Sequence, residues 1–445
     1  MSLTLPDRTS ATAALLPVVG DDLQVPLVTG GSVRYANLDI AASAPALRSV
    51  AERVDELLPF YSSVHRGAGH ASAVSTAAYE TARQVVADFV GARPDDVVQL
   101  VRHTTDAFNL LATAVPADLG GVVVLDVEHH ANLLPWQGAE RRVVTAAATL
   151  PATLGAVEAE LARRPAALLA VTGASNVTGE VLPLDALAAI AHRHGARIAV
   201  DGAQLVPHRR LDMAALDIDY LAFSGHKLYA PYGAGVLVGR RDWLDAAPPY
   251  LAGGGAVRSV ALDEVSWTDV PARHEAGTPN VVGAVALAAA CEALAGLPDD
   301  AQATHEAALR ARLVEGLSGL PGVRVLRLWE DADALGLATF TVSGLRAELV
   351  AQFLSAEHGI GVRDGRFCAH PLLVRLNGGA TAVRASTGIG NSSDDVDRLL
   401  VALGELVSAG PSWTYGADDL PVPDPRPFPT WARSGVGVGG CACRD

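Results

Sequence analysis

Strand and helix patterns alternate through the first two thirds of the chain, and this alternation restricts the fold more than any other feature. Short apolar runs typical of buried strands occur in GGVVVLDVEHH, PAALLAVTGASN, ARIAVDGAQ, DYLAFSGHK and AGVLVG. Between two of them, PLDALAAIAHRHG places Leu184, Leu187, Ile190 and Ala191 along one helical face and stops at Gly195. Strands alternating with helices predict a mostly parallel sheet with helices on both faces.

Polar residues gather where these strands end. Functional groups of such sheets collect at the carboxyl ends of the strands. The residues placed there are His129, Asn176, Asp201, Ser224 and Lys227. We therefore expect a functional site at this edge of the sheet.

The pattern changes from about residue 291. EAALRARLVEGLSGL, AELVAQFLSAEHG and DDVDRLLVALGELVSAG are amphipathic helix patterns, and ATFTVSG is a strand pattern. We expect an N-terminal arm (1–34), a large domain (35–290) and a small α+β domain (291–410) that includes part of the N-terminal segment. The proline- and glycine-rich tail (411–445), which carries Cys-Ala-Cys near its end, is expected to be extended or disordered.

The charge balance bears on partners and compartment. The chain has 445 residues, with 34 basic and 49 acidic ones and a net charge of -15, which argues against nucleic acid and anionic membranes as partners. No apolar run reaches the roughly 18 residues of a membrane span, and ATAALLPVV lacks the features of a signal peptide. Four cysteines make no disulfide framework, which favours a reducing compartment, the cytoplasm.

Lys227 lies in FSGHKLYAPYGAGVL, between a strand and a glycine loop. A desolvated lysine amine forms Schiff bases with carbonyls, whereas a surface lysine after a strand is the commoner case. Asp201 ends the preceding strand, and a carboxylate there can keep a pyridine nitrogen protonated, as pyridoxal 5'-phosphate (PLP) requires. The structural alternatives are a helix N-cap for Asp201 and a solvated helix residue for Gln204.

Several motifs in order carry a family resemblance over about residues 35 to 405. They are NLDIAASAP, SSVHRGAGHAS, VRHTTDAFNLLA, EHHANLLPWQ, TGASNVTGE, FSGHKLYAPYGAGVL, EAGTPN and VRDGRFCAHPLL. The chain resembles the class V aminotransferase-like group of fold-type I PLP enzymes, and within it the group II (SUF-type) cysteine desulfurases and selenocysteine lyases. The resemblance implies a large domain with a mostly parallel seven-stranded sheet, a smaller α+β domain and PLP as cofactor.

The resemblance also implies roles at the cofactor. Lys227 would bind PLP covalently, Asp201 would pair with its ring nitrogen and Gln204 with its ring hydroxyl, while His129 would stack on the ring. The phosphate would be held by Thr104, Thr105, Ser224 and His226, two of them at a predicted helix start. Thr278 would reach the phosphate of a second subunit, which implies a homodimer. The family usually has glycine where this chain has His103.

Substrate residues follow from the same resemblance. Arg384 would bind the carboxylate of an amino acid substrate as a bidentate clamp, assisted by Asn176. Arg363 would lie near the substrate, with a surface arginine as the alternative, and His65 falls at an active-site position of the family. The pair His129-His130 has no further ligand spacing of a metal site, so no metal is expected.

Cys368 decides the expected reaction, because removal of sulfur from cysteine to leave alanine needs a thiolate to accept the sulfur. Arg363 and Arg366 are nearby and favour the thiolate. The alternative is a buried apolar cysteine, which we expect for Cys291. The resemblance implies a cysteine desulfurase that passes a persulfide from Cys368 to an acceptor protein or thiol. Phe367 replaces a polar residue of the commoner RTGHHCAxPLM pattern, which points to an altered substrate choice.

Other activities stay open at this point. The same scaffold serves selenocysteine lyases and other PLP-dependent C–S lyases of biosynthetic pathways. A class V aminotransferase or epimerase would make Cys368 incidental. A non-catalytic sulfur carrier or partner-binding protein would use Cys441 and Cys443, although two cysteines alone make an incomplete zinc site.

Overall fold

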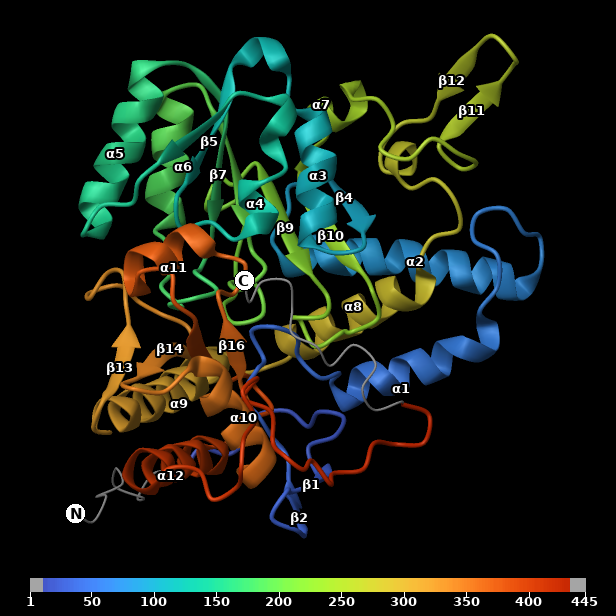
Figure 1. The fold of residues 1–445 in the computed structure, drawn as a ribbon. Coiled ribbons are helices and arrows are strands. Elements are labelled where there is room, and N and C mark those ends of the chain that lie inside the picture. Colours follow the sequence, from blue (N-terminus) through green and yellow to red (C-terminus); the bar gives the residue numbers. More distant parts are fainter. Residues whose placement is uncertain (1–10, 433–445) are drawn as a thin grey trace. The chain divides into compact units, whose positions relative to one another are not determined.

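The computed structural model describes residues 11–432, and they form two compact units. The large unit consists of Ser43–Ser175 and Val181–Pro298. The small unit consists of the described residues up to Ala42, Asn176–Glu180, and the described residues from Asp299 onward. Figure 1 shows the elements of both units.

A seven-stranded sheet forms the centre of the large unit. Its order is β4-β10-β9-β8-β7-β5-β6, and only β10 runs antiparallel to its neighbours. This confirms the predicted α/β fold with a mostly parallel seven-stranded sheet. The strands are β4 (Asp96–Val101), β5 (Gly121–Leu125), β6 (Arg141–Val144), β7 (Ala166–Thr172), β8 (Arg197–Asp201), β9 (Tyr220–Ser224) and β10 (Gly235–Arg240).

Helices cover both faces of this sheet because the central strands are apolar on both sides. Phe108 and Leu111 of α3 pack with Val122, Leu168 and Ala222 on one face. The alternate residues of the same strands, such as Val123, Leu169 and Leu221, are also fully buried. The helices are α1 (Arg48–Leu57), α2 (His70–Phe89), α3 (Thr104–Ala114), α4 (His130–Leu133), α5 (Leu150–Arg163), α6 (Leu184–Arg193), α7 (Arg241–Ala246) and α8 (Val281–Ala295).

Helix α6 illustrates how well the local pattern predicts an element. Leu184, Leu187, Ile190 and Ala191 are buried along one face, as their spacing predicts. The helix ends at Arg193, and Gly195 follows with φ +75, a left-handed conformation that glycine adopts without steric cost. A hairpin of β11 (Val257–Val260) and β12 (Val265–Trp267) completes the strands of the large unit (Figure 1).

An antiparallel sheet in the order β13-β14-β17-β16 forms the small unit with four helices. Its core contains Leu313, Phe340, Phe353, Leu399 and Leu403. The strands are β13 (Val323–Leu326), β14 (Leu337–Val342), β16 (Arg363–Gly365) and β17 (Ala382–Ser386), and the helices are α9 (Ala301–Ser318), α10 (Ala347–His358), α11 (His370–Asn377) and α12 (Ser393–Ala409). Short strands β1 (Gln24–Pro26) and β2 (Ser32–Arg34) pair with each other, and β3 (Ala36–Asn37) pairs with β15 (Ile360–Gly361).

Both ends of the described chain are attached to the small unit. Thr12 and Ser393 exchange hydrogen bonds, in which the Thr12 amide donates to Ser393 Oγ at 3.1 Å and the Ser393 amide donates to the Thr12 carbonyl at 2.9 Å. At the other end, the Glu357 carboxylate accepts from the Ser412 amide at 3.0 Å and the Tyr415 hydroxyl at 2.9 Å. No helix or strand follows α12 up to residue 432. Cys441 and Cys443 lie outside the described residues.

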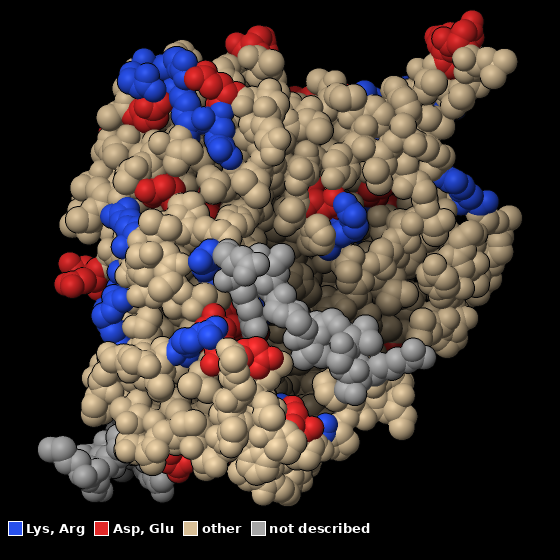
Figure 2. All heavy atoms as spheres, viewed as in Figure 1, with Lys and Arg blue, Asp and Glu red and all other residues tan. Residues whose placement is uncertain are grey.

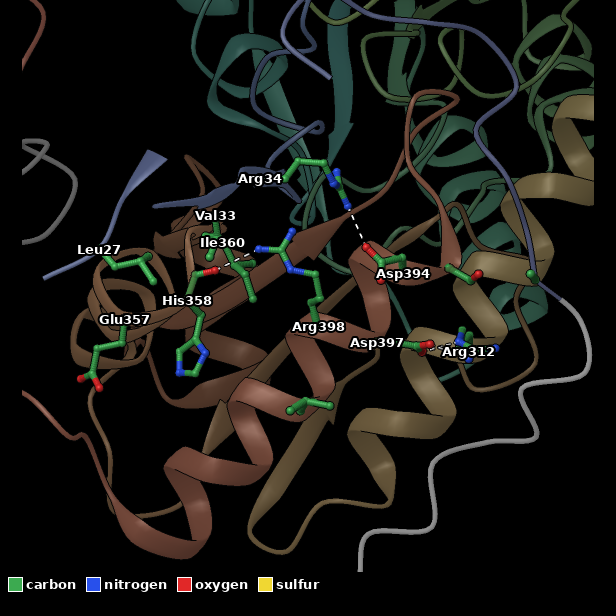
Figure 3. A pocket seen from close by; sticks show the side chains of 13 residues that line it. Leu27, Val33, Arg34, Arg312, Glu357, His358, Ile360, Asp394, Asp397 and Arg398 are labelled. Atoms are coloured by element: carbon green, nitrogen blue, oxygen red, sulfur yellow. Dashed lines mark hydrogen bonds and ion pairs between the residues drawn. The ribbon is translucent and has the colours of Figure 1, made fainter. Parts of the chain in front are cut away.

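A hollow of about 930 Å³ opens on the small unit between α10 and α12 (Figure 3). Arginines and aspartates line it together. Arg34 Nη2 donates to Asp394 Oδ2 at 2.9 Å, and Arg312 Nη2 donates to Asp397 Oδ2 at 2.7 Å. Arg398 donates to the His358 carbonyl at 3.0 Å. Arg34 and Arg312 therefore pair with aspartates of the same hollow.

Charged side chains are spread over the visible face of the molecule. Figure 2 shows basic and acidic residues interspersed among uncharged ones, without one extended area of a single sign. None of the helices within residues 11–432 has the length and apolar character that a bilayer span requires.

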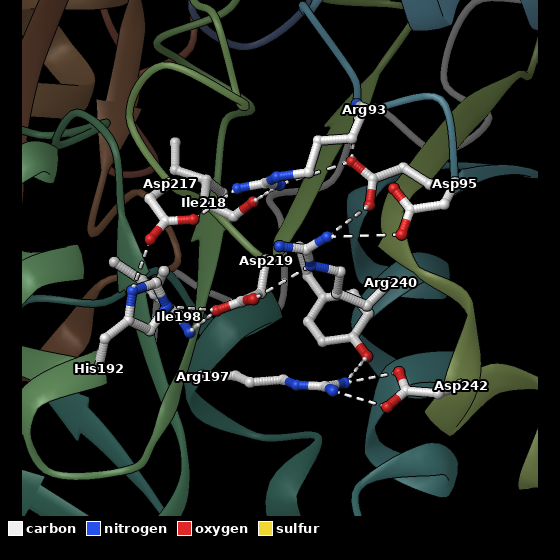
Figure 4. A network of polar contacts seen from close by, with 12 residues as sticks. Arg93, Asp95, His192, Arg197, Ile198, Asp217, Ile218, Asp219, Arg240 and Asp242 are labelled. Atoms are coloured by element: carbon white, nitrogen blue, oxygen red, sulfur yellow. Dashed lines mark hydrogen bonds and ion pairs between the residues drawn. The ribbon is translucent and has the colours of Figure 1, made fainter.

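A polar network ties the strand ends on the side of the large unit's sheet away from the carboxyl ends of β8 and β9 (Figure 4). Asp219 is 5% exposed; it accepts from the Ile198 amide at 3.0 Å and contacts His192 Nε2 at 2.8 Å. Arg197 forms a bidentate pair with the Asp242 carboxylate at 2.8 and 2.6 Å, but 59% of the Asp242 side chain is exposed. Burial makes the Asp219 contacts the more stabilising ones.

Asp219→Ala is expected to lower the free energy of unfolding by about 1–3 kcal/mol, because it leaves the buried Ile198 N–H without an acceptor. Asp242→Ala is the matched control, and its loss is expected to stay below about 1 kcal/mol because solvent screens that pair. Thermal or urea unfolding of both variants measures the difference, and equal losses would contradict the assignment.

Candidate active site

Asp201 occupies the carboxyl end of β8 and is 4% exposed. Its Oδ1 accepts from the Ala203 amide at 3.0 Å, so it caps the following turn as well as facing the site. Burial raises the pKa of Asp201, while the Ala203 hydrogen bond and the positive charge of Lys227 lower it. Gln204, three residues on, is also 4% exposed. A buried carboxylate in this setting gains from a cationic partner.

The end of β9 and the start of α3 make a cluster of hydrogen-bonding groups. Ser224 Oγ lies 2.7 Å from Thr104 Oγ1 and accepts from the Thr104 amide at 2.8 Å. Thr105, the next residue, is exposed at the same helix end. Hydroxyls and free amides at a helix N-terminus suit an anion such as a phosphate.

His103, which stands where the family usually has glycine, is the N-cap of α3. Its backbone is extended, with φ -171, so no glycine is needed for the conformation. His103 Nδ1 accepts from the Asp106 amide at 3.1 Å. The glycine that close packing here requires is Gly235, because a Cβ there would lie only 2.7 Å from the Cα of His103. The helix start therefore keeps a regular geometry with histidine.

Lys227 and His226 follow β9 in a tight turn, with the Lys227 amide donating to the Ser224 carbonyl at 3.3 Å. His226 Nδ1 lies 3.4 Å from Ser43 Oγ, and its carbonyl accepts from the Ala44 amide at 2.8 Å. Burial, Lys227 and His103 lower the pKa of His226 to about 4. His226 is therefore neutral at physiological pH and can donate one ring N–H.

Glu128, which the motif analysis does not single out, is a fully buried carboxyl directly before His129. It accepts from the Thr172 amide at 3.1 Å and from Asn132 Nδ2 at 2.8 Å. It therefore ties the segment that carries His129 to the end of β7, next to Asp201 on β8. The sequence sign of this role is weak, an acid three residues after a wholly apolar strand.

His129 is the N-cap of α4, and its Nδ1 accepts from the Ala131 amide at 3.0 Å. This hydrogen bond fixes the orientation of the His129 ring relative to the backbone of α4. Its neighbour His130 lies with its ring centroid 6.3 Å away. Among residues 11–432 no group of three or more histidine, cysteine or acidic side chains is arranged to hold a metal ion.

The EAGTPN segment is anchored at both sides of Thr278. Glu275 accepts from the Tyr79 hydroxyl at 2.8 Å, from Arg83 at 3.0 Å and from Gln99 Nε2 at 2.7 Å. On the other side, Asn280 caps α8 by accepting from the Gly283 amide at 2.9 Å. Thr278 itself is exposed between these anchors.

In the small unit, Arg384 on β17 is 3% exposed and holds the centre of a second cluster. Its Nη1 donates to the Asn176 carbonyl at 2.7 Å, and its Nη2 donates to Asp39 Oδ1 at 3.4 Å. Its Nε is buried without a partner in the described structure. Burial lowers the pKa of Arg384 and raises that of Asp39. An unpaired buried donor on a guanidinium is suited to a carboxylate ligand.

Cys368 lies in the same unit, after β16. Arg363 of β16 is the register partner of Arg384 on β17, so the two predicted substrate arginines lie side by side. Cys368 is partly exposed and has a left-handed backbone, with φ 52. The structure thus brings Arg363, Cys368 and Arg384 together with Asn176 in one unit.

Two further residues have other surroundings. His65 is exposed, and its Nε2 lies 2.9 Å from Glu80 Oε1. Cys291 is fully buried in α8, and burial raises the pKa of its thiol well above the ordinary value, which agrees with the inert core cysteine expected from sequence.

The sequence profile of the family Aminotransferase class-V matches residues 36–399. The chain is 39% identical over 390 residues to a cysteine desulfurase of Dickeya dadantii, covering 84% of this chain and 92% of that protein. It is 40% identical over 388 residues to a cysteine desulfurase of Klebsiella pneumoniae, covering 84% and 94%.

Solved structures give the same result. The cysteine desulfurase CsdA of Escherichia coli matches with a TM-score of 0.74 at 35% identity, over 83% of this chain and 94% of that one. The cysteine desulfurase of Thermococcus onnurineus matches with a TM-score of 0.77 at 32% identity, over 88% and 99%. The fold is therefore that of the fold-type I PLP enzymes. The chain belongs to the class-V aminotransferase family and is related to the cysteine desulfurases.

The residues of the large unit fit PLP. Ser224 and Thr104 offer hydroxyls to its phosphate, Asp201 offers a buried carboxylate to its ring nitrogen, and Lys227 offers an amine.

Glu128 gives a pH-dependent prediction. Burial and the charge of Asp201 raise the pKa of Glu128 from 4.5 to about 8. The folded state then keeps a proton that the unfolded state loses, so this group's contribution to stability is lost as pH rises from about 4.5 to about 8. Glu128→Gln removes this loss, and its melting temperature relative to the wild type is expected to rise from pH 5 to pH 8.

Glu128→Ala is the comparison, since it leaves the buried Thr172 N–H without an acceptor. It is expected to cost about 1–3 kcal/mol at every pH. In Glu128→Gln, Nε2 can donate to Asn132 Oδ1, which has no partner in the structure, once the Asn132 amide rotates. A pH-independent difference between Glu128→Gln and the wild type would show that Glu128 does not titrate in this range.

Proposed function

We propose that the protein is a PLP-dependent cysteine desulfurase that converts L-cysteine to L-alanine and leaves a persulfide on Cys368. The observation that carries this proposal is the position of Cys368, partly exposed beside the buried, incompletely paired guanidinium of Arg384. The relatives named cysteine desulfurase support it over most of the chain.

The cofactor side of the reaction uses the large unit. Bound PLP supplies an electron sink that weakens the bonds at the substrate Cα. Lys227 would hold the cofactor through its amine and would move the substrate Cα proton. Asp201 would keep the ring nitrogen protonated, while His129 and Gln204 would contact the ring and its hydroxyl. Thr104, Thr105, Ser224 and His226 hold the phosphate.

The substrate side uses the small unit. Arg384 binds the substrate carboxylate, with Asn176 holding Arg384 in place and Arg363 adding positive charge. Cys368 Sγ, as the thiolate, forms a bond to the substrate sulfur while the Cβ–S bond breaks. The electron pair of the broken bond stays on the substrate carbon, which takes a proton and leaves as alanine. The persulfide sulfur then passes to an acceptor protein or thiol.

Assembly and location belong to the same proposal. We propose a homodimer, in which the exposed Thr278 would serve the phosphate site of the second copy. We also propose that His65, exposed and paired with Glu80, is a substrate-side residue. A persulfide carried on a cysteine suits a reducing compartment, and we propose the cytoplasm.

Cys368→Ala is expected to bind PLP normally and to lose alanine production from cysteine at least about 100-fold, because no thiolate takes the sulfur. Alanine, sulfide and the mass of the Cys368 peptide are measured with cysteine, selenocysteine and cystathionine as substrates. Normal turnover of cysteine by Cys368→Ala would refute the role of the thiol. A keto acid product without sulfide would favour an aminotransferase.

Lys227→Ala tests the covalent binding of the cofactor independently of the Cys368 thiol. Reduction of the wild-type protein with borohydride is expected to leave the cofactor attached to the peptide that contains Lys227. The variant is expected to show no such peptide and turnover lower by at least about 1000-fold, since both the covalent attachment and the proton carrier are lost. Labelling at another lysine would contradict the assignment.

A further inference from the structure

Phe367, directly before the proposed nucleophile Cys368, has a backbone conformation that is unfavourable for a residue with a side chain. Phe367 and Cys368 are consecutive non-glycine residues with φ of 54 and 52. This left-handed region is unfavourable for residues with a side chain and persists where surrounding contacts hold it. Contacts within the small unit must therefore offset the strain of this dipeptide.

Two contacts of Phe367 supply that support. Its carbonyl accepts from Asn176 Nδ2 at 2.8 Å, and the Arg384 guanidinium carbon lies 5.2 Å from the centre of its ring. The ring is only 7% exposed. Arg384 in turn donates to the Asn176 carbonyl at 2.7 Å, so Asn176, Phe367 and Arg384 form a closed set of contacts.

These contacts determine which hydrogen-bond donors of the Arg384 guanidinium remain for a ligand. One face of the guanidinium lies against the Phe367 ring, Nη1 is used by Asn176, and Nη2 reaches Asp39 only at 3.4 Å. The remaining donor is the buried Nε, which has no partner. Nε and Nη2 form the edge of the guanidinium that binds a carboxylate in bidentate fashion, and within residues 11–432 the hydrogen bond of that edge is the long Nη2 contact with Asp39.

We propose that Phe367 is a positioning residue for the substrate carboxylate, whose ring fixes the Arg384 guanidinium so that the edge formed by Nε and Nη2 faces an α-amino acid. The inference rests on the proposed function and names the residue that links its carboxylate site to its nucleophile. An aromatic ring is required because an aliphatic side chain offers no π face to the cation.

The test measures binding of L-alanine, the product of the proposed reaction, to the PLP-loaded protein by the change in the cofactor's absorbance spectrum. Phe367→Leu is expected to weaken alanine binding about three- to tenfold. Phe367→Tyr keeps the ring face and is expected to stay within about twofold of the wild type. Phe340→Leu, which removes a buried ring from β14 of the same unit, is the matched control and is expected to leave alanine binding unchanged.

A double-mutant cycle separates positioning from a general structural effect. In an Arg384→Met background, Phe367→Leu is expected to cause no further loss of alanine binding, because the ring acts through the guanidinium. With cysteine as substrate, Phe367→Leu is expected to raise KM more than it lowers kcat.

Two results would overturn the inference. One is an unchanged alanine affinity in Phe367→Leu, and the other is an equal loss with and without Arg384. Should Phe367→Leu not fold, as judged by its melting curve, Phe367→Tyr and Phe367→Met carry the same comparison. Failure of the proposed function is distinct, because the wild type itself would then show no cofactor spectrum or no sulfur release from cysteine.

Discussion

Desolvation of charged side chains that are only partly compensated is the constraint on which both clusters of candidate site residues, one in each unit, depend. Asp201 in the large unit and Arg384 in the small unit are both nearly inaccessible to solvent. Burial raises the pKa of the acid and lowers that of the base, so each is destabilised in its charged form. A ligand with a cationic ring nitrogen relieves the first, and one with a carboxylate relieves the second. Under the proposed function, the ring nitrogen of the cofactor would pair with Asp201 and the substrate carboxylate with Arg384.

The surrounding architecture makes this burial possible without collapse of the fold. Apolar strands on both faces of the large sheet isolate its carboxyl edge, and the Glu128 hydrogen bonds connect neighbouring segments there. In the small unit, the antiparallel pairing of β16 with β17 sets Arg363 beside Arg384. Asp201 and Arg384 therefore lie on strands, while Cys368, the proposed nucleophile, lies on a short strained segment between β16 and α11.

Sequence reasoning identified most of the residues now found at these two places. Motifs located Lys227, Asp201, Ser224, Arg384 and Cys368, because short motifs preserve the chemical groups that a reaction needs. Helix α6 and the central strands were also predictable, since each has a hydrophobic period of its own. Glu128 and Asp39 were not identified. Each is a single acid beside an apolar segment, and only its spatial neighbours show that it is buried and paired.

The amino-acid sequence by itself determined the alternation of elements, the family and the kinds of side chain available for chemistry, because these follow from local periodicity and short motifs. Only the tertiary structure decided that Asn176, four residues beyond a strand of the large sheet, belongs to the small unit and holds both Phe367 and Arg384. It alone also placed Phe367 against the guanidinium. The physical reason is that contacts between residues nearly 200 positions apart depend on how the chain packs, which no local pattern encodes.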